Sequence, residues 1–297
     1  MNTFSPIVLF TYRRLGPLQK TIQSLKENYL ASQSDLYIFS DAAKSDSDSE
    51  AVNAVREYIH SIDDFKTITI FEAARNKGLA SSIIDGVTQI LKIHNTVIVL
   101  EDDLVSSRNF LNFMNEALDF YREEPKVFSI AGFSMPIKSN TKFDNYFTQR
   151  SSSHGWAIWK DRWMRIDWAV SDYNEFKSNR KLKHSFNKMG SDMSGMLDRQ
   201  MQGKINSWAI RWCYHQFKYG LFSVHAINSK IENVGFTIDA SNTTEKYNRF
   251  KTILDNGVKT SFLFSPHIRL DPKIIKQFTK PFSILLRIKY KAINLFQ

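Results

Sequence analysis

Three consecutive carboxylates, Glu101, Asp102 and Asp103, are the residues of this sequence best suited to chemistry. They directly follow an apolar run, residues 96–100, that is typical of a strand buried on both faces. Three such charges repel one another unless a cation lies among them. Mn²⁺ and Mg²⁺ take oxygen ligands of this kind, commonly one or two carboxylates completed by water and a substrate diphosphate. The triad therefore predicts a divalent-cation site.

The geometry of the triad depends on the local backbone. In an extended chain alternate side chains point apart, so we expect Asp103 to face the crevice and Asp102 to face away. Two other arrangements remain open, in which the acids cap a helix near Phe110 or pair with Arg108. The enzymatic interpretation fails if Asp103 is turned inward, or is locked to an arginine with no open cleft in front of it.

Short strands and helices alternate through the first half of the chain. Apolar runs predict strands at residues 6–10, 35–41, 66–71, 96–100 and 127–132, and helical spacing predicts helices at 15–29, 48–61, 79–93 and 110–122. This alternation indicates an α/β fold with a mostly parallel sheet flanked by helices. Ligands of such sheets bind beyond the carboxyl ends of the strands, which selects residues 11–13, 40–41, 72–78 and 101–103.

The second half has a different character. Residues 151–168 contain four tryptophans, and a helix is expected at 207–219, capped by Asn206 or Ser207. Residues 271–297 carry six Lys and Arg against one Asp, interleaved with apolar residues. That pattern is typical of a helix in the interface of an anionic membrane. The alternative is a terminal helix docked on the core.

Composition narrows the class of protein. With 297 residues, 42% hydrophobic and 24% charged, the chain can bury a substantial core. A single cysteine, Cys213, excludes an intramolecular disulfide, and no apolar run reaches the roughly 18 residues of a spanning helix. No signal peptide is evident, so we expect a cytoplasmic protein. The net charge is −3 over residues 1–150 and +13 over 151–297, and a basic half usually meets phosphate, nucleic acid or an anionic membrane.

Five segments in order resemble a known family: Val8-Leu9-Phe10-Thr11-Tyr12-Arg13, Ile38-Phe39-Ser40-Asp41, Arg75-Asn76-Lys77-Gly78, Val97 to Leu104 and His154-Gly155-Trp156. Together they are similar to nucleotide-sugar-dependent glycosyltransferases of GT-A fold. Within that fold they resemble the N-acetylglucosaminyltransferase I group and bacterial family 2-like enzymes of surface-polysaccharide synthesis. The resemblance covers about residues 5–165. It implies a GT-A-type, Rossmann-like sheet with a mixed acceptor-side region.

The resemblance also implies roles for individual residues. Asp103 matches the ligand of Mn²⁺ or Mg²⁺. Asp102 matches a contact to the ribose or sugar, and Glu101 is expected to bind the substrate as well. The remaining matches are contacts to the nucleotide and its phosphates (Thr11, Arg13), to the base (Asp41), to the ribose and diphosphate (Asn76, Lys77, Gly78), and to the donor sugar and acceptor (Gly155, Trp156).

An inverting reaction also needs an Asp or Glu to accept the proton of the acceptor hydroxyl. The N-acetylglucosaminyltransferase I group has an aspartate just before a helix that begins with Trp. This sequence has Asn206-Ser207-Trp208 there, and neither side chain is a carboxylate. Asp192 is the first substitute, followed by Asp198 and Glu232.

The combined hypothesis is a metal-dependent, inverting glycosyltransferase of surface-polysaccharide biosynthesis, peripheral at the inner face of the plasma membrane. It would move a sugar from a nucleotide-diphosphate sugar to a glycan or lipid-linked acceptor. Residues 1–135 would bind the donor, 136–262 the acceptor, and 263–297 would form a basic amphipathic tail. The alternatives are a sugar nucleotidyltransferase, although residues 11–16 lack the required Gly-rich loop, and a non-enzymatic protein that binds membranes through its tail. Nucleic acid is not an expected partner, because the candidate site is acidic.

Overall fold

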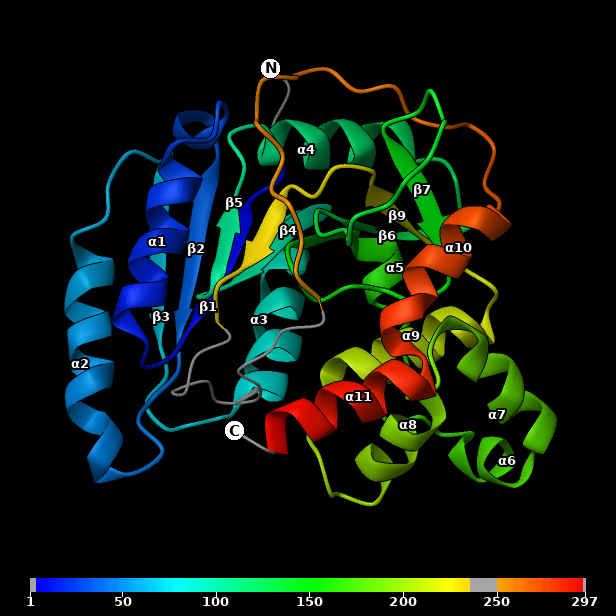
Figure 1. Cartoon of the computed structure of the whole chain (residues 1–297). Helices are drawn as coiled ribbons and strands as arrows, with labels where there is room; N and C mark the ends of the chain where they lie inside the picture. The colour runs from blue at the N-terminus through cyan, green and yellow to red at the C-terminus, as the bar shows by residue number, and fades with distance from the viewer. Residues whose placement is uncertain (1–3, 236–249, 296–297) are drawn as a thin grey trace.

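The computed structural model describes residues 4–235 and 250–295 (Figure 1). Its centre is an eight-stranded sheet in the order β3-β2-β1-β4-β8-β6-β9-β7. Four neighbouring pairs are parallel, and β8 and β7 run antiparallel to their neighbours. Helices cover both faces (Figure 1). The expected α/β class, with a large and mostly parallel sheet flanked by helices, is confirmed.

The first half of the sheet is parallel throughout. It comprises β1 (Ile7–Thr11), β2 (Asp35–Ser40), β3 (Thr67–Glu72) and β4 (Thr96–Glu101), connected by α1 (Leu15–Lys26), α2 (Asp46–His60) and α3 (Leu79–Ile93). Ile7 and Leu9 of β1 face the core shared with α1 and α2, whereas Val8 and Phe10 face α3. Both faces of β1 are therefore covered, which is why its sequence is apolar without alternation.

The second half completes the sheet by returning to it. After α4 (Phe110–Phe120) and β6 (Val127–Ala131), the chain adds β7 (Asn145–Thr148), β8 (Trp156–Trp159) and β9 (Phe222–Ala226). Strand β8 lies between β4 and β6, with Trp156 opposite both Val99 and Ala131. The smaller helices are α5 (Lys160–Trp163), α6 (Tyr173–Ser178), α7 (Arg180–Phe186), α8 (Met193–Met201) and α9 (Trp208–Lys218), with short 3-10 turns η1 (Ala31–Gln33) and η2 (Asn187–Met189).

A two-stranded ribbon lies beside the main sheet. Strand β5 (Leu104–Ser106) directly follows the acidic triad and pairs antiparallel with β10 (Ile231–Asn233). This pairing brings the chain after β10 against the triad, because the backbone N–H of Val234 donates to the Asp103 carbonyl at 2.9 Å.

The C-terminal residues begin as part of the core. Phe264 is buried, and the Tyr121 hydroxyl donates to the Ser265 carbonyl at 2.7 Å. Helix α10 (Pro272–Thr279), the turn η3 (Lys280–Phe282) and helix α11 (Ile284–Leu295) follow. Within residues 4–235 and 250–295, no helix is both long and apolar enough to cross a bilayer.

Candidate functional site

The acidic triad is closed by an arginine. Asp102 and Asp103 form a turn between β4 and β5. Nη2 of Arg14 lies 3.1 Å from Oδ1 of Asp102 and 2.6 Å from Oδ2 of Asp103. The expectation that the two aspartates point apart is wrong, because a turn rather than an extended chain brings both carboxylates to one side. Arg108 instead lies over the Tyr29 ring.

Arg14 joins three segments that are distant in the sequence. It immediately precedes α1, and its Nη1 donates to the Gly235 carbonyl at 3.3 Å. The second oxygen of Asp102 accepts from the backbone N–H of Tyr12 at 3.2 Å and from the Thr11 hydroxyl at 3.4 Å. A Cβ at position 235 would lie 1.9 Å from Oδ2 of Asp103, so this close approach requires glycine.

Burial sets the protonation of the triad. It raises the pKa of Glu101 to about 8, and the charges of Asp103 and Asp102 add to that effect. It raises the pKa of Asp102 to about 6, against the opposing charge of Arg14. Burial also lowers the pKa of His154, and the charge of Asp103 opposes it. Burial therefore favours the neutral form of Glu101, which limits the negative charge gathered around Arg14.

A metal ion does not fit this cluster as it is arranged. Carboxylate oxygens suit Mn²⁺ or Mg²⁺, but the point on which Asp102 and Asp103 converge is filled by the guanidinium of Arg14. Over the described ranges, no three His, Cys, Asp or Glu side chains gather to hold a metal ion. An ion at Asp103 would have to displace Arg14, which weighs against the predicted metal ligand. Asp103 is bound to an arginine, so the first part of the condition under which the enzymatic interpretation fails is met.

The carboxylate of Asp41 holds the loop before α3. Its oxygens accept from the backbone N–H groups of Lys77 and Gly78, each at 2.9 Å, and Asn76 donates to the Ala42 carbonyl at 2.7 Å. Gly78 has a φ of 74°, which favours glycine. The predicted nucleotide-binding residues Asp41, Asn76, Lys77 and Gly78 thus lie together. Asp41 positions Lys77 and Gly78, and the Ala42 carbonyl positions Asn76.

A cavity of about 120 Å³ opens beside this loop. Phe39 and Phe71, whose ring centroids are 4.7 Å apart, form one side of it, while Asp41, Lys77 and Ser82 supply polar groups. The volume suits a single planar ring rather than a whole nucleotide. The cavity lies where β2 and β3 end, the edge at which ligands bind in sheets of this kind.

Thr11, the last residue of β1, and Arg13, which follows the strand, both have structural partners. Arg13 forms an ion pair with Asp48 near the start of α2, and the Tyr12 hydroxyl donates to the same carboxylate at 2.7 Å. The Arg13 side chain is 38% exposed, whereas Thr11 is buried beside Asp102. Arg13 therefore lies at the margin of the edge formed by the carboxyl ends of the parallel strands, and Arg14 lies at the centre of that edge.

Gly155 and Trp156 are constrained by packing. The Trp156 side chain is fully buried, and its ring lies 4.6 to 5.6 Å from the rings of Trp212, Trp208 and Trp163. No face of this ring is open to a sugar. Gly155 has a φ of 60°, and a Cβ there would lie 2.5 Å from the Ile231 side chain. Gly155 therefore allows the start of β8 to approach β10, whereas Trp156 packs β8 against α9 and Trp163.

The candidate general bases differ in their surroundings. Asp192 forms a bidentate ion pair with Arg150, at 2.8 and 2.9 Å. Burial acts to raise the pKa of Asp192, but the hydrogen bonds and charge of Arg150 outweigh it and hold the pKa below its usual range. Asp198 is bound by Lys183 and Tyr173. Glu232 is half-buried on β10 opposite Val105, and its carboxylate has no ion pair within the part of the chain that the structure describes.

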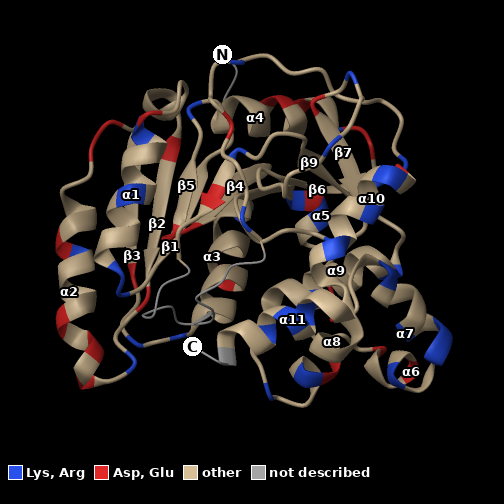
Figure 2. Cartoon of the chain, in the orientation of Figure 1, with Lys and Arg blue, Asp and Glu red and all other residues tan. Residues whose placement is uncertain are grey.

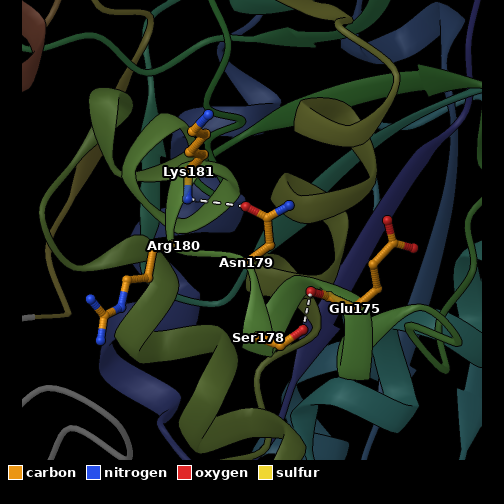
Figure 3. Close-up of a pocket in the computed structure, with 5 residues that line it drawn as sticks. All are labelled: Glu175, Ser178, Asn179, Arg180 and Lys181. Atoms are coloured by element: carbon orange, nitrogen blue, oxygen red, sulfur yellow. Dashed lines mark hydrogen bonds between the residues drawn. The ribbon is translucent and has the colours of Figure 1, made fainter.

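A second hollow lies between α6 and α7, away from the strand ends (Figures 1 and 3). Asn179 caps α7 there by accepting from the backbone N–H groups of Lys181 and Leu182, at 3.0 and 3.1 Å. Glu175 and Arg180 project outward (Figure 3). The hollow is thus the start of a short helix, and none of the predicted site residues lines it.

No protein-family model matches this chain, and no curated protein sequence matches it either. Among solved structures, a mannosyltransferase of Pyrobaculum calidifontis in complex with GDP-Man and Mn²⁺ is 14% identical (TM-score 0.38), with 56% of this chain aligned to 48% of that one. TarS of S. aureus is 12% identical (TM-score 0.37), with 62% of this chain aligned to 33% of that one. A UDP-glucose pyrophosphorylase complexed with UDP-glucose is 14% identical (TM-score 0.32), with 54% of this chain aligned to 78% of that one. The aligned part of this chain thus spans about half the length of the mannosyltransferase and about one third of the length of TarS. Similarities this low identify no family.

Proposed function

We propose that this protein is a GT-A-type glycosyltransferase that moves a sugar from a nucleotide-diphosphate sugar to a glycan or lipid-linked acceptor of surface-polysaccharide synthesis. One observation carries the proposal. A ring-sized cavity, a loop held by Asp41 and the cluster of Arg14 with two aspartates all lie at the carboxyl ends of the parallel strands. Open α/β sheets bind their ligands at this edge.

The donor would lie along this edge. Its base would enter the cavity beside Phe39 and Phe71, and its ribose and diphosphate would follow residues 76–78. Helix α3 begins just after Gly78, and the N-terminus of a helix favours phosphate through its unpaired N–H groups and its dipole. Lys77, an exposed cation at the same loop, adds positive charge.

Departure of the nucleoside diphosphate places negative charge on the leaving group, and fixed cations stabilise that charge where it develops. Lys77 is an exposed cation at this edge and Arg13 lies at its margin, whereas the charge of Arg14 is already bound by Asp102 and Asp103. The predicted Mn²⁺ or Mg²⁺ at Asp103 is not part of this proposal, because the guanidinium of Arg14 fills the point between Asp102 and Asp103.

Glu232 is the general base of the proposed inverting reaction. It would accept the proton of the acceptor hydroxyl as that oxygen attacks the anomeric carbon, and the diphosphate would leave from the opposite face. Glu232 is preferred to Asp192, because Arg150 already binds both oxygens of Asp192. Strand β10 holds Glu232 near the triad, since its neighbour Asn233 is paired with Leu104.

The test is a thermal-shift screen of nucleotide sugars, with and without Mn²⁺. A donor at a hundred times its Kd should stabilise the protein by about 2.7 kcal/mol. Ser82→Phe should abolish that shift, because Ser82 lines the cavity. Ser81→Phe is the matched control, since Ser81 is likewise half-buried on the same helix and does not line the cavity. A wild-type protein that responds to no nucleotide sugar, or equal responses of the two variants, would refute the proposed donor site.

A further inference from the structure

The basic tail consists of two parts with different surroundings. Helix α10 and the turn η3 are docked on the core, with Ile274, Phe278 and Phe282 buried. The Arg150 guanidinium lies 3.7 Å over the ring of Phe282. Asp271 caps α10 by accepting from the backbone N–H of Lys273 at 2.8 Å. The expectation of a docked terminal helix therefore describes this first part.

Helix α11 is different, because it presents apolar side chains to solvent. Ile284, Leu285 and Ile288 are 61%, 81% and 62% exposed. Their spacing places them on one face of the helix. The helix is nevertheless held in place, since Arg287 donates to the Ser191 hydroxyl at 3.0 Å. The apolar face is thus a fixed feature of the described surface.

Positive charge surrounds this apolar face. Lys280, Lys289 and Lys291 are exposed beside it, and residues 263–297 carry seven Lys and Arg against one Asp. Figure 2 shows the Lys and Arg of α10 and α11. A second copy of this chain would bring like charges together, whereas an anionic bilayer offers both hydrocarbon and negative headgroups. Charge complementarity therefore selects the lipid surface as the partner.

We propose that α11 docks on an anionic membrane, with Ile284, Leu285 and Ile288 in the headgroup region and the lysines at the phosphates. Helix α11 lies on the same side of the molecule as the connections that follow β1 to β4 (Figure 1, lower side). Docking would therefore hold the carboxyl edge of the sheet near the bilayer. The benefit of that position rests on the proposed glycosyltransferase function, because a lipid-linked acceptor lies in the membrane. The docking of α11 does not depend on that function.

The experiment is co-sedimentation of the full chain with vesicles of phosphatidylcholine and phosphatidylserine, compared with vesicles of phosphatidylcholine alone. We expect binding to the anionic vesicles. Neutralising Lys289 and Lys291 together (K289Q/K291Q) should weaken that binding about 25-fold, from about fivefold per charge. The double variant L285S/I288S should weaken it by about tenfold or more. Ile93→Ser is the matched control, because Ile93 is 69% exposed at the end of α3 and should leave binding unchanged.

Three results would overturn the docking proposal. These are wild-type protein that stays in the supernatant, equal binding to the two kinds of vesicle, and variants of α11 that bind like the Ile93→Ser control. A concentration-dependent dimer that L285S/I288S abolishes would assign the face to a second copy instead. The nucleotide-sugar thermal shift is measured on each variant. Its absence in the wild type refutes the proposed function alone, and its retention in α11 variants that lose vesicle binding shows that they remain folded.

Discussion

Replacing Arg14 with Ala should destabilise the protein by about 3 kcal/mol. The substitution leaves Asp102 and Asp103 facing a common point without their cation. Removing one partner of a buried ion pair costs about 3–5 kcal/mol. The side chains of Arg14, Asp102 and Asp103 are 15%, 9% and 15% exposed, so water relieves part of the repulsion and the lower end of that range applies.

Urea unfolding at pH 7 measures this change as a lower midpoint with an unchanged slope. Arg13→Ala is the matched control, because the neighbouring Arg13 pairs with Asp48 through a side chain that is 38% exposed. Such an exposed pair contributes little to stability, because solvent and salt screen it. Mn²⁺ should stabilise Arg14→Ala more than the wild type, since the position between the two carboxylates becomes open to a cation.

A loss below about 1 kcal/mol in Arg14→Ala would refute the inference that this arginine holds the triad together. An equal loss in Arg13→Ala would refute it as well, because the effect would then not depend on the triad. Equal stabilisation of both proteins by Mn²⁺ would place the ion elsewhere.

Three further predictions concern residues near the edge and in the core. Glu232→Gln should abolish sugar transfer while calorimetry gives an unchanged Kd for the donor; activity near the wild-type rate would exclude Glu232 as the base. Asp192→Asn should lower the free energy of unfolding by about 3 kcal/mol at pH 7, because Arg150 stays buried without its charged partner. Because the pKa of Asp192 is lowered, this difference in free energy should persist above about pH 4 and shrink in stronger acid. Burial lowers the pKa of His225 to about 4, so the wild type should lose stability as the pH falls from about 6.5 to 4. His225→Gln should flatten that decline in urea unfolding, and a parallel decline would contradict the assignment.

The parallel half of the fold could be predicted because its signals are local. The run Ile7-Val8-Leu9-Phe10 is apolar at every position since both faces of β1 are covered, and α3 has its apolar residues at helical spacing. Strand β8 was missed. Its four residues, Trp-Ala-Ile-Trp, show no alternation, and their partners in β4 and β6 are distant in the sequence.

The centre of the candidate site could be predicted only in part. The triad follows a recognisable strand, but its partner was one of two adjacent arginines. Arg14 rather than Arg13 turns inward, because it meets the turn after β4 and the Gly235 carbonyl, 221 positions away. Trp156 was expected at the sugar, but three other tryptophans cover it. Contacts of this range leave no periodic signal in a single sequence.

The position of β8 has a consequence for how the chain folds. Strand β6 has β8 and β9 as its neighbours, and both are supplied by later residues. Until about Trp159 has left the ribosome, β4 therefore has an unpaired edge and β6 has no partner. Exposed edges of this kind template aggregation. A fragment that ends at residue 135 should therefore accumulate in inclusion bodies. In the full chain, β8 pairs with both β4 and β6 and so covers these edges.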